Sequence, residues 1–271
     1  MCIVQVFIRW YALLFAHKFF FKFNLFIYHL GLCGMGVGNC DDIISGEKYF
    51  LKYLFKKKRR EQERTIVDIG ANIGNYSLLV NAISESVKIH AIEPVPNNYT
   101  ELCKNVLHVN NIIPYNMAIN EQSGVLSIYD YDDNNSEHAS LYKEVFTRLH
   151  NNSKVEEFTV KAMSLDEFCE INHIENIFLL KIDTEGNEYN ILRSAKRMFA
   201  EKKIEIIQFE FNEMNVVSRV FFKDFYDLLH EDYCIYRLLP KGFLPIRKYK
   251  PNQQEWFMFQ NIVCIRNDIA F

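Results

Sequence analysis

Short apolar runs and helix-length segments alternate along most of the chain. Runs such as TIVDI (65–69) and IFLLKID (177–183) are too short for helices and consist mostly of apolar residues. Apolar runs of this length are typical of parallel strands that helices cover on both faces. The sequence therefore predicts an α/β fold around a mostly parallel sheet. The predicted strands are 65–69, 87–93, 112–119, 177–183, 204–211, 235–239 and 259–266, and the predicted helices are 49–55, 75–83, 96–108, 165–171, 187–199 and 220–229.

Two segments depart from this alternation. Residues 125–131 and 155–163 have the pattern of strands and flank a polar loop around NNSEHAS (134–140), which predicts a β-rich insertion with a lid over a binding site. The glycine-rich stretch 31–48 has no regular pattern and precedes the first predicted helix. We therefore predict an N-terminal segment, residues 1–44, followed by one domain, residues 45–271.

The first 30 residues are the most apolar part of the chain. They contain 23 apolar side chains, and no acidic residue precedes Asp41. Arg9, Lys18 and Lys22 interrupt every run long enough to span a membrane, which needs about 20 apolar residues. Two interpretations carry equal weight: an interfacial helix with basic residues at lipid headgroups, or a helix packed on the domain's own surface. Peripheral membrane contact through residues 1–30 is thus one of two alternatives, and a spanning helix is a weaker third.

Composition and charge exclude several classes of function. The chain has 271 residues, of which 31 are basic and 34 acidic, for a net charge of −3. Because no basic excess exists to neutralise phosphates, a nucleic-acid partner is not expected. The seven cysteines are scattered without a CxxC pair, so neither a zinc site nor a disulfide framework is expected. Such thiols suit a reducing compartment, which predicts a cytoplasmic protein, peripheral at a membrane if residues 1–30 bind lipid.

The sharpest local feature is the block VDIGANIGNYSLL (67–79). A predicted strand ends around Asp68, Gly70 and Gly74 flank a tight turn, and a predicted helix begins directly afterwards. The glycines are spaced GxxxG, whereas a pyrophosphate cradle needs GxGxxG. The turn therefore favours a nucleoside ligand without pyrophosphate over NAD. Glu93 ends the second strand 19 residues after Gly74, where a carboxylate can hold ribose hydroxyls.

Three blocks, VDIGANIGNYSLL, HAIEPVPNNYTELCKNV and LLKIDTEGNEYNIL, together resemble the FkbM-type family of S-adenosylmethionine-dependent methyltransferases. SLDEF (164–168) also resembles that family, and the likeness covers roughly residues 45–266. It implies a Rossmann-like, seven-stranded class I methyltransferase sheet, mostly parallel with an antiparallel last strand and helices on both faces. It implies S-adenosylmethionine as cofactor, with the adenine near Asn116–Asn120. The residues it assigns to the cofactor are Asp68, Gly70, Ala71, Asn72, Gly74 and Glu93.

The resemblance also implies O-methylation of a small molecule, with a sugar hydroxyl of a glycan or glycolipid as the expected acceptor. Ligands of open parallel sheets bind outside the carboxyl ends of the strands, where Asp183, Glu185 and Glu210 stand. We expect Asp183 to act as base or to position the acceptor, and Glu185 and Glu210 to hold sugar hydroxyls. A divalent metal on these carboxylates is a weaker alternative, so no metal ligand is assigned. His138, in the predicted lid, is an alternative base.

Two other classes of function are weighed against this one. A non-catalytic nucleoside-binding or scaffold protein on the same fold could be held at a membrane by its N-terminal helix, but it would not need both Asp68 and Glu93. A nicotinamide-dependent oxidoreductase is disfavoured by the GxxxG spacing. Absence of S-adenosylmethionine binding to the purified protein would refute the methyltransferase hypothesis, and bound NAD would favour the oxidoreductase.

Overall fold

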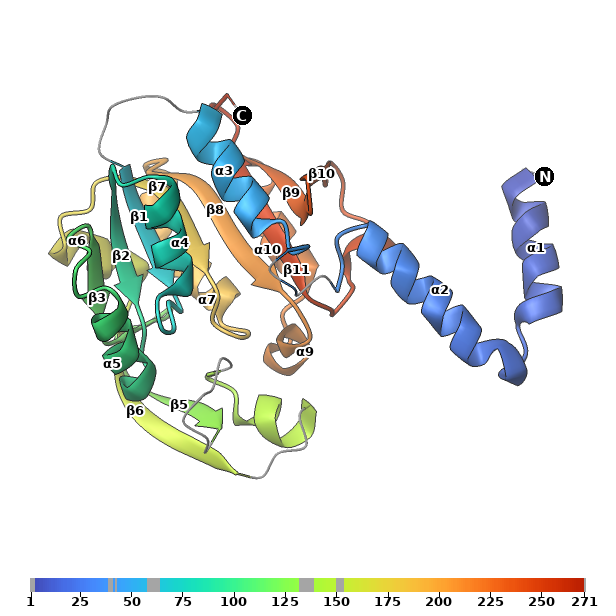
Figure 1. Cartoon of the computed structure of the whole chain (residues 1–271), viewed down its shortest axis with the longest axis horizontal. Helices are drawn as coiled ribbons and strands as arrows, with labels where there is room; N and C mark the ends of the chain where they lie inside the picture. The colour runs from blue at the N-terminus through green and yellow to red at the C-terminus, as the bar shows by residue number, and fades with distance from the viewer. Residues whose placement is uncertain are drawn as a thin grey trace.

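The body of the protein is a central sheet covered by helices on both faces, and two N-terminal helices project from it (Figure 1). The computed structural model describes residues 3–38, 41, 43–57, 64–131, 139–149 and 154–270.

The central sheet has eight strands in the order β10-β9-β11-β8-β7-β1-β2-β3. Five neighbouring strands, β8, β7, β1, β2 and β3, run parallel to one another. β11 lies between β8 and β9 and is antiparallel to both. This order confirms the predicted sheet with an antiparallel last strand. The eighth strand, β10, was not predicted because its four residues, GFLP, are a short edge hairpin containing glycine and proline. The strands are β1 (Arg64–Ile69), β2 (Val87–Ile92), β3 (Ile112–Tyr115), β7 (Ile177–Ile182), β8 (Ile204–Phe211), β9 (Tyr233–Leu239), β10 (Gly242–Pro245) and β11 (Gln260–Arg266).

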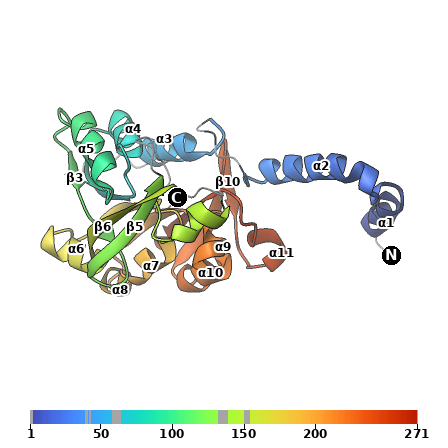
Figure 2. The ribbon, with the colours of Figure 1, turned by 90° about the horizontal axis from the view of Figure 1, so that it is seen from below.

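The helices form one layer on each face of the sheet, as Figure 2 shows from a second direction. One layer buries side chains of α3, α4 and α5 against β1 and β2. The other buries side chains of α6, α7, α8 and α10, and includes a stacked ring pair, Phe209 and Phe225, with centroids 4.5 Å apart. The two apolar layers explain why the strands are apolar on both faces. The helices of the body are α3 (Glu47–Lys57), α4 (Asn75–Ile83), α5 (Pro96–Asn105), α6 (Leu165–Ile171), α7 (Glu188–Arg193), α8 (Lys196–Ala200), α9 (Met214–Ser218), α10 (Phe222–Leu229) and α11 (Pro251–Gln254).

Two predicted elements are broken where polar side chains hydrogen-bond to the backbone. The strand predicted at 112–119 stops after Tyr115, because the Asn116 amide donates to the carbonyls of Glu93 and Pro94. The chain resumes as β4 (Ala118–Ile119), which pairs with β6 (Val155–Met163) and β5 (Gly124–Tyr131) in a separate three-stranded sheet. This small sheet is the predicted β-rich insertion, and a π-helical turn, Val145–Leu149, follows β5.

The helix predicted at 187–199 is likewise interrupted, at Ser194. The Ser194 hydroxyl donates to the carbonyl of Ile191 and accepts the amide N–H of Leu165, so it replaces a helical hydrogen bond with contacts to α6. Side-chain bonds of this kind compete with the helix ladder. The result is two short helices, α7 and α8, instead of one.

The N-terminal segment is two helices, α1 (Ile3–Phe15) and α2 (Phe21–Gly34), joined by a 3-10 turn at Lys18–Phe20. They bend by 100°, because His17 is extended and its ring nitrogen accepts the amide N–H of Phe19. The prediction of a single helix in this segment is therefore wrong.

This N-terminal helix pair also stands apart from the body of the protein. No side chain of α1 is buried, and in α2 only Leu32 is buried, so the alternative of a helix packed on the domain surface is not what the structure shows. Among the described residues no individual helix meets the length and hydropathy of a membrane span, whereas the bent pair does when taken together.

Candidate active site

A cavity of about 1410 Å³ opens at the carboxyl ends of β1, β2, β7 and β8. It is lined both by the glycine turn after β1 and by the acidic residues after β7 and β8, so the structure brings the two predicted halves of the site together. This edge is where ligands bind in open parallel sheets. The predicted site residues that line it are Gly70, Asn72, Glu93, Asp183, Glu185 and Glu210.

The glycine turn is shaped by contact between β1 and β7. Gly70 has a φ of +81°, and a Cβ placed on it would lie 1.7 Å from the carbonyl oxygen of Asp183. Gly74 has a φ of +92° and a Cβ there would lie 2.7 Å from the Leu102 side chain. No other residue type fits either position without displacing its neighbours. The backbone can therefore pass close to both Asp183 and a ligand in the cavity.

Three of the predicted cofactor residues lie behind the cavity wall. Asp68, Ala71 and Gly74 are not among the residues that line it. The buried Asp68 accepts a hydrogen bond of 2.6 Å from the Ser77 hydroxyl, which ties β1 to α4. Burial raises the pKa of Asp68 to about 6. In this arrangement Asp68 orients the turn rather than facing the ligand space directly.

Glu93 lies at the end of β2 and holds the glycine turn from the other side. Its carboxylate accepts the amide N–H groups of Asn72 and Val95, at 2.9 and 2.8 Å. Asn72 has a φ of +48°, a left-handed conformation that asparagine tolerates better than most residues. Burial raises the pKa of Glu93 to about 7. The predicted adenine region contributes an apolar wall, Met117 to Ile119, to the same cavity.

The loop after β7 is held in an unusual backbone conformation. Glu185 and Gly186 are consecutive residues with positive φ, +53° and +108°. The buried Glu188 carboxylate accepts the Thr184 hydroxyl and the amide N–H groups of Thr184 and Gly186. Burial raises the pKa of Glu188 to about 7. Glu188 thus keeps the loop folded so that Asp183 and Glu185 face the cavity, which explains the TEGNE part of the third block.

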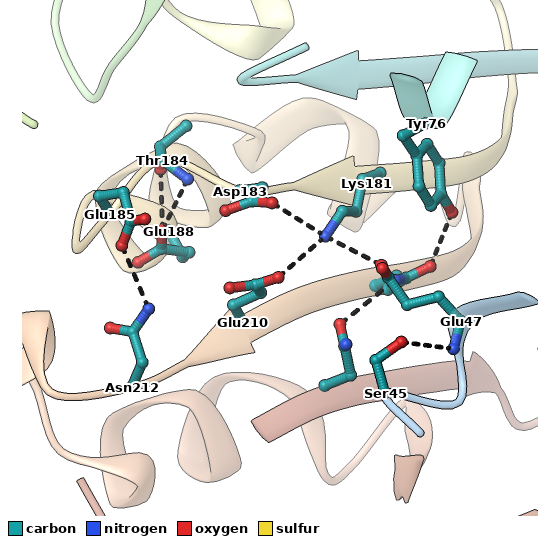
Figure 3. A network of polar contacts seen from close by, with 12 residues as sticks. Ser45, Glu47, Tyr76, Lys181, Asp183, Thr184, Glu185, Glu188, Glu210 and Asn212 are labelled. Carbon is teal, nitrogen blue, oxygen red and sulfur yellow. Dashed lines mark hydrogen bonds and ion pairs between the residues drawn. The ribbon is translucent and has the colours of Figure 1, made fainter. Parts of the chain in front are cut away.

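A buried lysine lies between three carboxylates beside this loop (Figure 3). The Lys181 ammonium is 3.3 Å from Glu47, 3.4 Å from Asp183 and 3.5 Å from Glu210. Burial opposes its charge, but the carboxylates of Asp183, Glu47 and Glu210 raise its pKa well above the ordinary value. Burial and the neighbouring Asp183 raise the pKa of Glu210 well above its usual range, against the effect of Lys181.

Two further side chains connect this acidic cluster to the sheet. The Tyr76 hydroxyl donates to the Gln208 side chain at 2.7 Å, and the Gln208 amide donates to Glu47. Gln208 and Lys181 are paired in register on β8 and β7, so their side chains share one face. Tyr76 also lies against the ammonium of Lys181, with 5.5 Å to the ring centroid.

Sequence reasoning missed Lys181 and Glu47. Lys181 carried a usable signal, since it is a charged residue inside the apolar run IFLLKID, two positions before Asp183 and on the same face of the strand. Glu47 carried none, because it comes from the start of α3, far from β7 in the chain. Burial of an ammonium in a strand requires acidic partners, which is the reasoning that would have placed carboxylates around it.

The predicted lid is described only in part. Ser140 and Leu141 line the cavity, and the Ser140 hydroxyl donates to the carbonyl of Glu185 at 2.8 Å, so this segment packs on the loop after β7. His138, the alternative base, lies outside the described residues. Within the part of the chain that the structure describes, no three His, Cys, Asp or Glu side chains are arranged as ligands of a metal ion.

A curated protein of known activity is similar to this chain. The hexuronic acid methyltransferase AglP of Haloferax volcanii is 23% identical over 166 residues, which cover 61% of this chain and 63% of that protein. This chain therefore matches less than two thirds of its relative's length.

Solved structures that this chain resembles include an O-methyltransferase from Bacillus cereus in complex with SAH, which is 11% identical. The match covers 89% of this chain and 88% of that one, with a TM-score of 0.44. A precorrin-6y C5,15-methyltransferase from Geobacter metallireducens is 9% identical, with 85% and 95% covered and a TM-score of 0.42. Residues 68–238, more than half of the chain, match the family described as the methyltransferase FkbM domain. The chain belongs to this FkbM methyltransferase family.

Proposed function

We propose that the protein is an S-adenosylmethionine-dependent O-methyltransferase whose acceptor is a sugar hydroxyl. The observation that carries this proposal is a single cavity with two unlike ends. One end has the glycine turn and Glu93, and the other has the acidic cluster around Lys181. A nucleoside cofactor and a polyhydroxylated acceptor would meet between them.

The first end suits the nucleoside part of S-adenosylmethionine. Gly70 and Asn72 line the cavity, so the backbone of the glycine turn borders the ligand space there. Gly70 and Asn72 would hold the methionine part, Glu93 would accept the ribose hydroxyls, and Met117 to Ile119 would cover the adenine. When bound, this cofactor supplies an electrophilic methyl group on a sulfonium, which leaves readily as a thioether.

The second end supplies the groups that an acceptor hydroxyl needs. Asp183 is the most exposed carboxylate bound to Lys181, with 35% of its side chain accessible, and we assign it the role of base for the hydroxyl proton. Glu210 is 9% exposed and lines the same cavity, so its carboxyl group can form a hydrogen bond with a sugar hydroxyl. Glu185 is held by the Asn212 amide at 3.3 Å and faces the same space.

The charge of this end favours a hydroxyl over a carboxylate as the methylated group. Glu47, Asp183, Glu185 and Glu210 line the cavity, and Lys181 is the cation that their cluster encloses. An acidic sugar would add a further negative charge to a desolvated acidic site, which is unfavourable. AglP is named for action on hexuronic acid, which supports a sugar acceptor here, and the acidic cluster directs the proposal to neutral or amino sugars.

The test uses the purified full chain, S-adenosylmethionine labelled in its methyl group, and a panel of p-nitrophenyl glycosides of glucose, galactose, glucosamine and glucuronic acid. We expect label in a neutral or amino sugar that withstands mild alkali, as an ether does and a methyl ester does not. Asp183→Asn should lower turnover by about 10²–10⁴-fold, the usual contribution of a general base, and change cofactor affinity little.

Glu201→Gln is the matched control, because this exposed carboxylate precedes β8 at the opposite end of the strands from the cavity. It should turn over like the wild type. Label found only in glucuronic acid, and released by alkali, would contradict the choice of a hydroxyl acceptor. Transfer that is equally fast in Asp183→Asn would remove Asp183 from the role of base.

A further inference from the structure

The two N-terminal helices project from the body of the protein (Figure 1). Their apolar side chains are largely exposed. Sixteen of the 27 exposed large apolar side chains in the described residues lie between Ile3 and Leu30. Phe7 is 74% exposed, Leu13 77% and Phe19 82%. Soluble proteins rarely leave so continuous an apolar patch in water, so this surface requires a partner.

The helix pair has a defined corner. The Asn24 amide donates to the carbonyl of Phe15 at 2.9 Å, and the Tyr11 hydroxyl donates to the Asn24 oxygen at 2.6 Å. The Phe15 ring packs on Phe20 and Tyr11, with centroids 5.1 and 4.9 Å apart. These contacts pair the Phe15 carbonyl and the Tyr11 and Asn24 side chains within the segment. Side-chain hydrogen bonds and ring contacts therefore hold the corner, and apolar side chains beside it, such as Phe19, are exposed.

The charges of this segment identify the kind of partner. The first 40 residues contain three basic side chains, Arg9, Lys18 and Lys22, and no acidic one. All three are exposed. Trp10 and Tyr28, which are also exposed, are residue types enriched at the boundary between lipid and water. Apolar side chains, interfacial aromatic rings and positive charge together match the surface of an anionic bilayer.

The geometry of the pair favours a position in the interface over the alternatives. A helix of 13 or 14 residues is about 20 Å long, which is shorter than the ~30 Å hydrocarbon core. The bend of 100° prevents the two helices from forming one straight span. A second copy of this chain is a poor occupant, because it would bring three more positive charges and no acid to the contact.

The end of α2 is fixed to the wall of the active-site cavity. The Arg237 guanidinium donates to the Met35 carbonyl at 3.3 Å, and the Gly38 amide donates to the Phe259 carbonyl at 2.7 Å. Gly36 packs so closely on β9 that a Cβ would lie 2.5 Å from the Leu238 oxygen. Phe259 lines the cavity, as do Ser45 and Glu47 from the segment that follows. A surface bound by α1 and α2 would therefore lie at a set position relative to the cavity.

We propose that α1 and α2 dock the protein in the headgroup region of an anionic bilayer. Arg9, Lys18 and Lys22 contact lipid phosphates, and the exposed apolar side chains enter the acyl boundary. A second part of the inference rests on the proposed function: the docked enzyme methylates an acceptor that is attached to lipid, because the hydrogen bond between Gly38 and Phe259 joins the docked segment to the cavity wall.

The docking is tested by sedimentation of the full chain with vesicles of phosphatidylcholine and phosphatidylglycerol in a 3:1 ratio, against phosphatidylcholine alone. We expect binding to the anionic vesicles that weakens with salt. The triple variant Arg9→Glu, Lys18→Glu, Lys22→Glu should bind at least ~100-fold more weakly, since each basic residue near such a surface contributes about fivefold and charge reversal adds repulsion. The variant Phe7→Ser, Phe19→Ser should also lose binding.

The matched control reverses three exposed lysines of the body, Lys161, Lys196 and Lys241, and should bind like the wild type. Circular dichroism and binding of S-adenosylmethionine check that each variant is folded. The proposal is overturned if the full chain stays in the supernatant, if the N-terminal reversal binds normally, or if bound protein has lost residues 1–30 by intact mass. It is also overturned if bound protein resists 1 M salt and alkaline carbonate, as an inserted span does, or if the Phe variant abolishes a dimer instead of vesicle binding.

The two parts of the inference fail separately. Vesicle binding without any methyl transfer would refute the proposed function and leave the docking intact. If docking delivers the acceptor, the N-terminal charge reversal should leave methyl transfer to soluble glycosides unchanged. The same variant should lose transfer to an acceptor glycolipid in the vesicles. Equal transfer to the glycolipid by both proteins would refute the delivery role.

Discussion

Replacing Lys181 with methionine should destabilise the protein in a way that depends on pH. Methionine keeps the length of the side chain and removes the ammonium, so Glu47, Asp183 and Glu210 would face one another without a cation. At 3.3–3.5 Å and an effective dielectric constant of 20, each pair attracts by about 5 kcal/mol. Desolvation of the ammonium offsets several kcal/mol of this sum.

Solvent screens part of the cluster, which reduces the expected loss. Asp183 is 35% exposed, so its contact with Lys181 contributes little. Most of the effect comes from Glu210, whose side chain is 9% exposed. Removing one partner of a buried ion pair typically costs about 3–5 kcal/mol, because the other charge stays buried without compensation. We expect Lys181→Met to lower the free energy of unfolding by about this much at pH 8.

The pH dependence follows from the pKa of Glu210. Its pKa is already raised in the folded protein, and loss of Lys181 raises it further. A carboxyl whose folded pKa is raised costs stability as pH rises through that pKa, and costs little below the unfolded pKa. The loss should therefore be smaller at pH 5 than at pH 8. Adding Glu210→Gln to Lys181→Met should recover about 1–3 kcal/mol at pH 8.

Urea denaturation followed by circular dichroism measures these free energies at both pH values. Lys88→Met, on the partly exposed part of β2, is the control and should change stability by no more than about 0.5 kcal/mol. A loss below about 1 kcal/mol for Lys181→Met at pH 8, or an equal loss at pH 5 and pH 8 without recovery in the double variant, would refute the reasoning about the cluster.

Two other outcomes follow from the site. Gly70→Ala places a methyl group against the Asp183 carbonyl at a positive φ, so it should lower the free energy of unfolding by at least about 1–2 kcal/mol in urea denaturation. It should also weaken S-adenosylmethionine binding in calorimetry. Gly242→Ala, where no atom lies near the added methyl group, should change neither quantity. Because burial raises the pKa of Glu93 and Glu188 to about 7, wild-type stability without ligand should fall as pH rises from 5 to 8, by up to about 3 kcal/mol for each group. A free energy of unfolding that rises over that range would contradict the burial of these carboxyls in neutral form.

The parallel strands could be predicted from the sequence because burial on both faces leaves a strong local pattern. The runs ending near Asp68, Glu93 and Asp183 were placed within one or two residues of the observed strands. Elements broken by a side-chain bond to the backbone could not be predicted, as at Asn116 and Ser194, since the deciding partner lies elsewhere in the fold.

The glycine turn and the acidic residues of the site could also be predicted from local sequence, because a single residue type, glycine or a carboxylate, meets the steric or charge requirement at each position. Which of them face the cavity was not accessible. Asp68 belongs to the motif yet lies behind the wall, bonded to Ser77. Glu47 lines the cavity from the start of α3, where only the folded chain brings it to Lys181. Electrostatic partners that are far apart in the chain have no characteristic sequence spacing, so their pairing could not be predicted.

The central claim is that the cavity binds S-adenosylmethionine through the glycine turn and Glu93. Isothermal titration calorimetry of the full chain with S-adenosylmethionine tests it most directly. We predict saturable binding of one molecule per chain, weakened at least tenfold in Glu93→Ala, which loses about 1.4 kcal/mol or more of hydrogen bonding to the ribose. Absence of binding to the folded wild type, or equal affinity in Glu93→Ala, would contradict the account.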